Sequence, residues 1–122
     1  MKTTWLALAV LSVLVTPASL RAHHGDSNYD LTKEITVNGT VTELRFINPH
    51  IQIFFDVKSD KGTVEKWICQ GTSPNMLVHH GWTRETLKPG DEIKIVGNRA
   101  KNGTNTMRLS KIESNGKEIS PI

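Results

Sequence analysis

Residues 51–57 place an apolar side chain at every second position, Ile51, Ile53, Phe55 and Val57, and this period constrains the fold more than any other feature of the chain. A period of two predicts a β-strand that buries one face. Similar short runs, each bounded by turn residues, predict further strands at residues 63–70, 92–98 and 106–113. The chain is therefore expected to consist mainly of short strands joined by tight turns.

A longer strand is predicted to begin at Ile35. The apolar residues from Ile35 to Val41 fall at odd-numbered positions, which would place them on one face of a strand. Leu44 and Phe46 fall at even-numbered positions, which would place them on the other face, so the parity of the pattern changes. A change of parity within one run predicts a β-bulge, and Asn38-Gly39 is a second position at which the strand could bend. We therefore expect a long, sharply curved first strand.

One segment has the features of a complete short helix, and a further helical turn is expected from Thr83. Ser73 fits a helix N-cap and Pro74 the first helical position, and Gly81 fits the end of a short helix. The resulting order, three strands, a helix and two strands, predicts an all-β fold with one short helix, a five-stranded Greek-key barrel of the oligonucleotide/oligosaccharide-binding (OB) type. An open meander with a packed helix is the alternative. This single domain is expected to cover residues 34–122.

The N-terminal segment has the pattern of a signal peptide. An apolar run over residues 5–15 is too short to span a bilayer as a helix. Cleavage is expected after Ala22, with Ala18 as the competing site, so residues 1–22 would be removed and the protein would be periplasmic or secreted. Residues 23–33 are polar and aperiodic, which predicts an N-terminal arm.

Charge and motifs exclude several functions. Of 15 Lys and Arg residues, Lys2 and Arg21 lie in the predicted signal, which leaves 13 against 12 Asp and Glu. Such a balance does not suggest a nucleic-acid partner. No common enzyme motif occurs, so we expect a non-enzyme. The single cysteine, Cys69, cannot form an internal disulfide and is expected to be buried.

Several short motifs together resemble a family of small exported bacterial proteins classed as a domain of unknown function. The resemblance covers essentially the whole predicted mature chain and implies export and a small β-barrel-like domain, without an established activity. The chain departs from the family pattern at Gln70 and at His79-His80. The motifs are HH…YD (His23, His24, Tyr29, Asp30), GTV (39–41), NPH (48–50), Trp67, SPN.L (73–77), GWTR.TLKPGD (81–91) and K.G (101–103).

Three histidines predict a copper site. After cleavage at Ala22, His23 would carry a free α-amine next to its imidazole, and both groups lose protons readily and can chelate one ion. His24 adds a nearby imidazole, and His50 is a candidate anchor on the barrel. Three nitrogen donors suit Cu(II). We therefore expect a copper-binding protein that serves metal capture, delivery or tolerance.

Other candidate residues leave alternatives open. Met76, His79 and His80 lie on one side of the predicted helix and form a possible second metal cluster, although Met76 and Leu77 could instead fill the barrel end while the histidines face solvent. Trp67 and Trp82 could face a ligand. The chain could thus be a metal-free interaction module that binds a protein, peptide or sugar on the barrel face. A third alternative is an oxidative copper enzyme.

Overall fold

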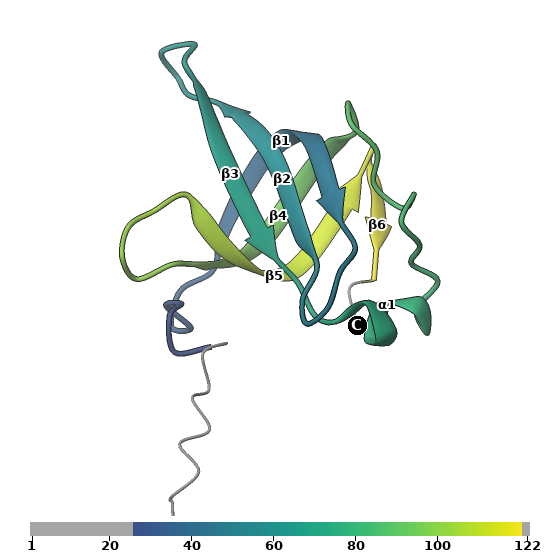
Figure 1. Ribbon diagram of the computed structural model, residues 1–122. Coiled ribbons are helices and arrows are strands. Elements are labelled where there is room, and N and C mark those ends of the chain that lie inside the picture. The colour runs from purple at the N-terminus through teal and green to yellow at the C-terminus, as the bar shows by residue number, and fades with distance from the viewer. Residues whose placement is uncertain (1–25, 121–122) are drawn as a thin grey trace, which may run out of the picture.

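The computed structural model describes residues 26–120, and within them six strands and one short helix form a single barrel (Figure 1). No helix among these residues is long and apolar enough to cross a membrane. The elements are β1 (Ile35–Arg45), β2 (Gln52–Lys58), β3 (Val64–Gln70), α1 (Pro74–Val78), β4 (Glu92–Arg99), β5 (Thr106–Ser114) and β6 (Lys117–Ile119).

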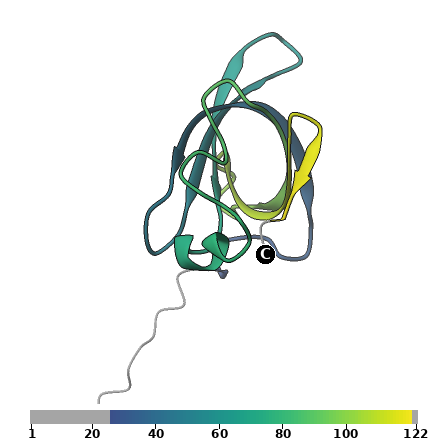
Figure 2. The same ribbon diagram turned by 90° about the vertical axis from the view of Figure 1, so that its right-hand side faces the viewer.

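The predicted five-stranded barrel is confirmed. The sheet order is β3-β2-β1-β4-β5-β6, and a parallel pairing of β3 with β5 closes the sheet into the ring seen in Figure 2. This closing seam is short, because it joins only residues 68–70 to residues 106–108. Every other pairing in the sheet is antiparallel.

β1 supplies the curvature that closure requires. Its register with β2 shifts between Val41 and Glu43, which confirms the bulge predicted from the parity change. Gly39 marks a close approach between strands. A Cβ at this position would lie 2.6 Å from the carbonyl oxygen of Asp56 and 2.7 Å from the ring of Phe55. The bulge and the glycine together let one strand pair with both β2 and β4.

The core lies inside the barrel, and α1 covers one end of it (Figure 1). Ser73 caps α1 as predicted, because its hydroxyl accepts a hydrogen bond from the Met76 N–H. Leu77 on α1 is completely buried, whereas Met76 is 47% exposed. On α1, Leu77 therefore packs into the core, and Met76 does not. Cys69 is buried in the core as expected.

One strand was not predicted from the sequence. Asn115 and Gly116 both have positive φ, 49° and 80°, and form the tight turn that their sequence predicts. This turn leads into the three-residue strand β6, which pairs with the end of β5. Three residues are too few to show a period of two, so the pattern of the sequence could not distinguish β6 from an irregular C-terminal segment.

Candidate functional site

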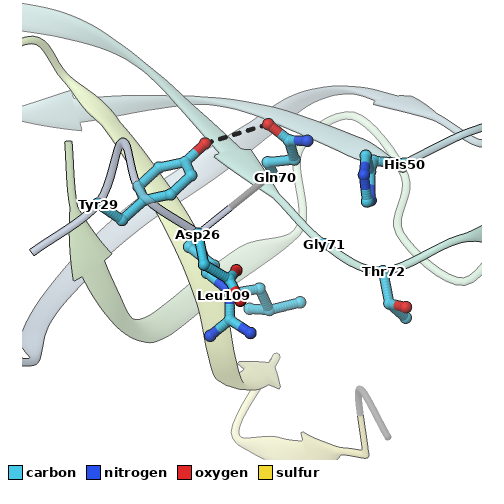
Figure 3. Close-up of a pocket in the computed structure, with 8 residues that line it drawn as sticks. Asp26, Tyr29, His50, Gln70, Gly71, Thr72 and Leu109 are labelled. Atoms are coloured by element: carbon cyan, nitrogen blue, oxygen red, sulfur yellow. Dashed lines mark hydrogen bonds and ion pairs between the residues drawn. The ribbon is translucent and has the colours of Figure 1, made fainter. Parts of the chain in front are cut away.

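A pocket of about 150 Å³ lies where the N-terminal segment meets the closing seam of the barrel. Figure 3 shows Gln70, at the end of β3, between Tyr29 and His50. The pocket is lined by Asp26, Tyr29, His50, Gln70, Gly71, Thr72, Arg108 and Leu109. Three separate parts of the chain therefore converge on it, namely the N-terminal segment, the loop that precedes β2 and the β3–β5 seam.

The N-terminal segment is fastened to the seam by two side-chain contacts. Tyr29 is buried, and its hydroxyl donates a hydrogen bond of 3.0 Å to the Gln70 Oε1 (Figure 3). Arg108 Nε lies 2.8 Å from Asp26 Oδ1 in an ion pair. Gln70 and Arg108 are partners in the parallel seam, which places both anchors side by side. From Asp26 onward, the segment predicted as an arm therefore follows the barrel surface.

A buried amide fixes the next part of this segment. Asn98 on β4 is 5% exposed, and its Nδ2 donates hydrogen bonds of 3.0 Å to the carbonyl oxygens of Asp30 and Lys33. The Asp30 N–H in turn donates to the Arg99 carbonyl oxygen. These bonds tie two carbonyl groups and one N–H group of the segment to β4. The segment thus enters β1 along a fixed path.

The hydroxyl of Tyr29 makes the pocket sensitive to alkaline pH. Burial raises the pKa of Tyr29 above its usual value of 10.0, with Cys69 as a second cause in the same direction. Because the unfolded chain ionises at a lower pH than the folded chain, this group's contribution to stability is complete below pH 10 and is lost as pH rises through the higher folded pKa. Tyr29 is the only tyrosine of the chain, so its ionisation can be followed without interference.

We expect Tyr29→Phe to lower the free energy of unfolding at neutral pH by about 1 kcal/mol, because it removes one neutral hydrogen bond and leaves the ring in place. The variant should also lose less stability than the wild type when pH rises above 10. Urea unfolding at pH 7 and pH 11 measures both effects. An unchanged midpoint at neutral pH, together with an identical alkaline loss in both proteins, would contradict the prediction.

His50 lies at the entrance of the pocket and is exposed. Two main-chain hydrogen bonds hold the residue that follows it, since the Ile51 N–H donates to the Thr72 carbonyl oxygen and the Gly71 N–H donates to the Ile51 carbonyl oxygen. Ile51 itself is completely buried. The backbone at His50 is therefore anchored to the end of β3, as a fixed metal ligand would require.

The other two predicted copper ligands, His23 and His24, lie outside the described residues. Asp26, three residues after His23, lines the same pocket as His50. Within residues 26–120 there is no group of three or more His, Cys, Asp and Glu side chains placed to hold a metal ion. The two aspartates nearest to these histidines in the sequence have other partners, because Asp26 pairs with Arg108 and Asp30 Oδ1 accepts hydrogen bonds from Thr32.

The second predicted metal cluster lies on α1 and at its C-terminal end. Met76 is on the helix, His79 is its C-cap and His80 follows, and all three side chains are exposed. The His80 N–H donates to the Leu77 carbonyl oxygen, which closes the last turn. A metal role for these three residues stays a prediction.

The two tryptophans occupy different environments. Trp82 is 1% exposed and its Nε1 donates to the Ser120 carbonyl oxygen, so it is a core residue and not a ligand-facing one. Trp67 is 7% exposed, packs against Phe55 and carries the Arg99 guanidinium 5.1 Å from its ring centroid. Trp82 therefore offers no exposed face to a ligand, whereas Trp67 lines a groove on the outside of the barrel.

Sequence reasoning did not single out Gln70 and Arg108 as parts of the site. Their proximity comes from the parallel β3–β5 pairing, which joins residues almost 40 positions apart and carries no local pattern. Tyr29 was noted only within a motif, and its isolated position in a polar segment gave no reason to expect burial. The burial of Tyr29 could have been predicted from its ring, the single aromatic side chain in this segment, because aromatic rings bury a large apolar area in folded proteins.

The barrel and its short closing seam define an OB-like fold. Among solved structures, the chain is similar to the mitochondrial single-stranded DNA binding protein Rim1 from S. cerevisiae, with a TM-score of 0.52 and 9% identity over 70% of this chain and 94% of that one. It also matches TiaS, crystallised in complex with a tRNA, AMPCPP and agmatine, with a TM-score of 0.46 and 24% identity over 67% of this chain and 18% of that one. At these identities the likeness to Rim1 concerns the fold alone.

The chain belongs to the family of unknown function DUF6152, whose model matches residues 9–109. No curated protein matches it. The family match covers the described N-terminal segment, the His50 loop and the whole seam, so the parts that form the pocket all fall within one family domain.

Proposed function

We propose that the protein is an exported copper-binding protein in which the amine and imidazole of His23, the imidazole of His24 and the imidazole of His50 supply the metal ligands. The observation that carries this proposal is the position of Asp26 in the pocket that His50 lines. Capture, delivery or tolerance of copper is the corresponding role.

The proposed nitrogen ligands suit Cu(II). Neutral imidazole and a deprotonated amine are strong ligands for Cu(II), which also has the highest affinity in the divalent series. Two nitrogens of one N-terminal histidine would close a chelate ring, and an imidazole from the barrel would complete a T-shaped set. Cleavage after Ala22 is required, because a peptide bond at His23 would remove the amine from the donor set.

The reach of the N-terminal segment is compatible with such a site. Asp26 is held at the seam by Arg108, so the segment starts from a fixed point at the pocket. Three extended residues span at most about 10 Å. His23 and His24 therefore need only a short tether to reach an ion at His50, and a short tether keeps the effective concentration of these ligands high.

Titration with Cu(II) of the purified exported protein tests the proposal, after its intact mass has confirmed His23 as the first residue. His23→Ala and His50→Ala should each weaken binding roughly 100-fold, as expected when one donor of a linked set is removed. His80→Ala is the matched control, because it removes an exposed histidine that does not line the pocket. It should leave the affinity for the first ion unchanged.

Two results would contradict the copper proposal. One is an exported chain that begins at Ser19, which lacks an N-terminal histidine. The other is weak Cu(II) binding that neither His23→Ala nor His50→Ala changes. Either result would favour the metal-free interaction module, in which the barrel face binds a protein, peptide or sugar.

A further inference from the structure

The outer edge of β3 is only partly paired. The seam with β5 begins at Ile68, whose N–H donates to the Asn105 carbonyl oxygen. Main-chain groups of alternate residues point to the same edge of a strand, so those of Lys66 and Val64 point to the same side as those of Ile68. Within residues 26–120, neither has a strand partner on that side. Both residues are also exposed.

This unpaired edge adjoins a groove of about 350 Å³ on the outside of the barrel. Phe54 and Ile68 are cross-strand partners, both are half-buried, and neither belongs to the core cluster. They form an apolar floor outside the barrel. Asn105 and Thr106 border the groove where β5 separates from β3. The groove therefore lies at the fork between the two strands.

The cations around the groove already have polar partners. Lys66 Nζ lies 3.5 Å from Asp56 Oδ1, and Arg45 Nε lies 3.0 Å from Glu43 Oε1. The Arg45 guanidinium also lies 4.5 Å from the centroid of the Phe54 ring. Arg99, which lies over Trp67, instead donates to the carbonyl oxygens of Gly103 and Thr104 and to Asn105 Oδ1. A polyanion gains little from a surface on which the cations already have such partners. The groove instead suits an uncharged ligand that carries both apolar groups and hydrogen-bonding groups.

We propose that the free edge of β3 binds an extended, uncharged peptide segment as an added strand, with an apolar side chain of the peptide seated over Phe54 and Ile68. The unpaired N–H and C=O groups of Val64 and Lys66 supply the main-chain hydrogen bonds, and the groove supplies side-chain selection. The site is independent of the copper proposal, because it shares no residue with the His50 pocket. For the alternative function, in which the barrel face binds a protein, peptide or sugar, it specifies an uncharged peptide as the ligand.

A second copy of this chain fits the edge less well than an uncharged peptide. Two copies paired around the middle of the edge would place Glu65 directly opposite Glu65 of the other copy. Like charges directly opposite each other destabilise a strand pair. The exposed Lys66 on the edge likewise disfavours pairing between copies.

The probe is a pentapeptide of sequence Thr-Val-Thr-Val-Thr, acetylated at its N-terminus and amidated at its C-terminus, titrated into ¹⁵N-labelled full-length exported protein. We expect saturable binding in the millimolar range, with the largest amide shifts at Val64, Lys66 and the groove residues. Amide exchange at Lys66 should slow on binding, because its N–H becomes hydrogen-bonded. Absence of saturable shifts at this edge would overturn the proposal.

Two variants at one position isolate the main-chain contribution. Lys66→Pro removes the outward N–H without removing a hydrogen bond from the β2–β3 ladder, whereas Lys66→Ala removes the same side chain and keeps that N–H. Binding to Lys66→Pro should be about tenfold weaker than to Lys66→Ala, the effect of one lost hydrogen bond. The amide spectrum of each variant verifies its fold. Equal affinities, or a concentration-dependent dimer in place of peptide binding, would overturn the proposal.

Discussion

Gly97→Ala is expected to lower the free energy of unfolding by about 3 kcal/mol or more, which is a large fraction of the ordinary stability of a small domain. A Cβ at this position would lie 1.9 Å from the Arg108 carbonyl oxygen and 3.1 Å from the end of the Met107 side chain. The first contact is with backbone, so a rotamer change cannot relieve it. Strands β4 and β5 would have to separate where their register already shifts.

Gly62→Ala is the matched control for Gly97→Ala. Gly62 has a φ of 80° in the β2–β3 turn, and a Cβ there would meet no atom within 4 Å. Its substitution therefore costs only the left-handed backbone conformation, about 1 kcal/mol. Urea unfolding followed by circular dichroism compares the two variants. A loss from Gly97→Ala no greater than the loss from Gly62→Ala would show that the β4–β5 contact can relax.

Features that depend on neighbouring residues could be predicted from the sequence. The alternation over residues 51–57 gave β2, and the parity change after Val41 gave the bulge of β1. Ser73 and Pro74 gave the start of α1. Each of these signals is local, because strand period, bulges and caps are set by residues within a few positions of each other.

The candidate site depends on contacts that no local pattern contains. Gln70 and Arg108 become neighbours only after the barrel closes, and the burial of Tyr29 follows from that closure. The same limit applies to α1, where the sequence allowed both Met76 and Leu77 to fill the barrel end, but only Leu77 is buried and Met76 is 47% exposed. A helix of five residues makes too few turns for its buried side to be recognised from periodicity.

The shortness of the closing seam links the two proposed binding sites. Only residues 68–70 of β3 pair with β5. The C-terminal end of this paired segment borders the pocket of His50 and Gln70, and its N-terminal end borders the groove and the free edge at Val64 and Lys66. A longer seam would cover the edge that a peptide strand needs. Closure of the barrel and the availability of a binding edge are therefore two consequences of the same three residue pairs.

Trp82→Ala is expected to lower the free energy of unfolding by about 3–5 kcal/mol, the usual cost of truncating a fully buried aromatic residue. Trp82 is among the largest completely buried side chains, and it lies in the loop between α1 and β4. Its Nε1 donates a hydrogen bond of 2.7 Å to the Ser120 carbonyl oxygen. The variant would therefore lose core volume and also release the C-terminal end from the loop.

Trp82→Phe separates these two contributions, because it keeps an aromatic ring in the core but removes the indole N–H. We expect a loss of about 1–2 kcal/mol, which combines a smaller ring with one missing hydrogen bond. Urea unfolding gives both free energies, and hydrogen exchange at the amides of β6 reports on the C-terminal end. Faster exchange in both variants would show that the indole hydrogen bond holds β6 in place. If β6 amides exchange at the wild-type rate in Trp82→Phe, the pairing with β5 alone is sufficient to hold this strand.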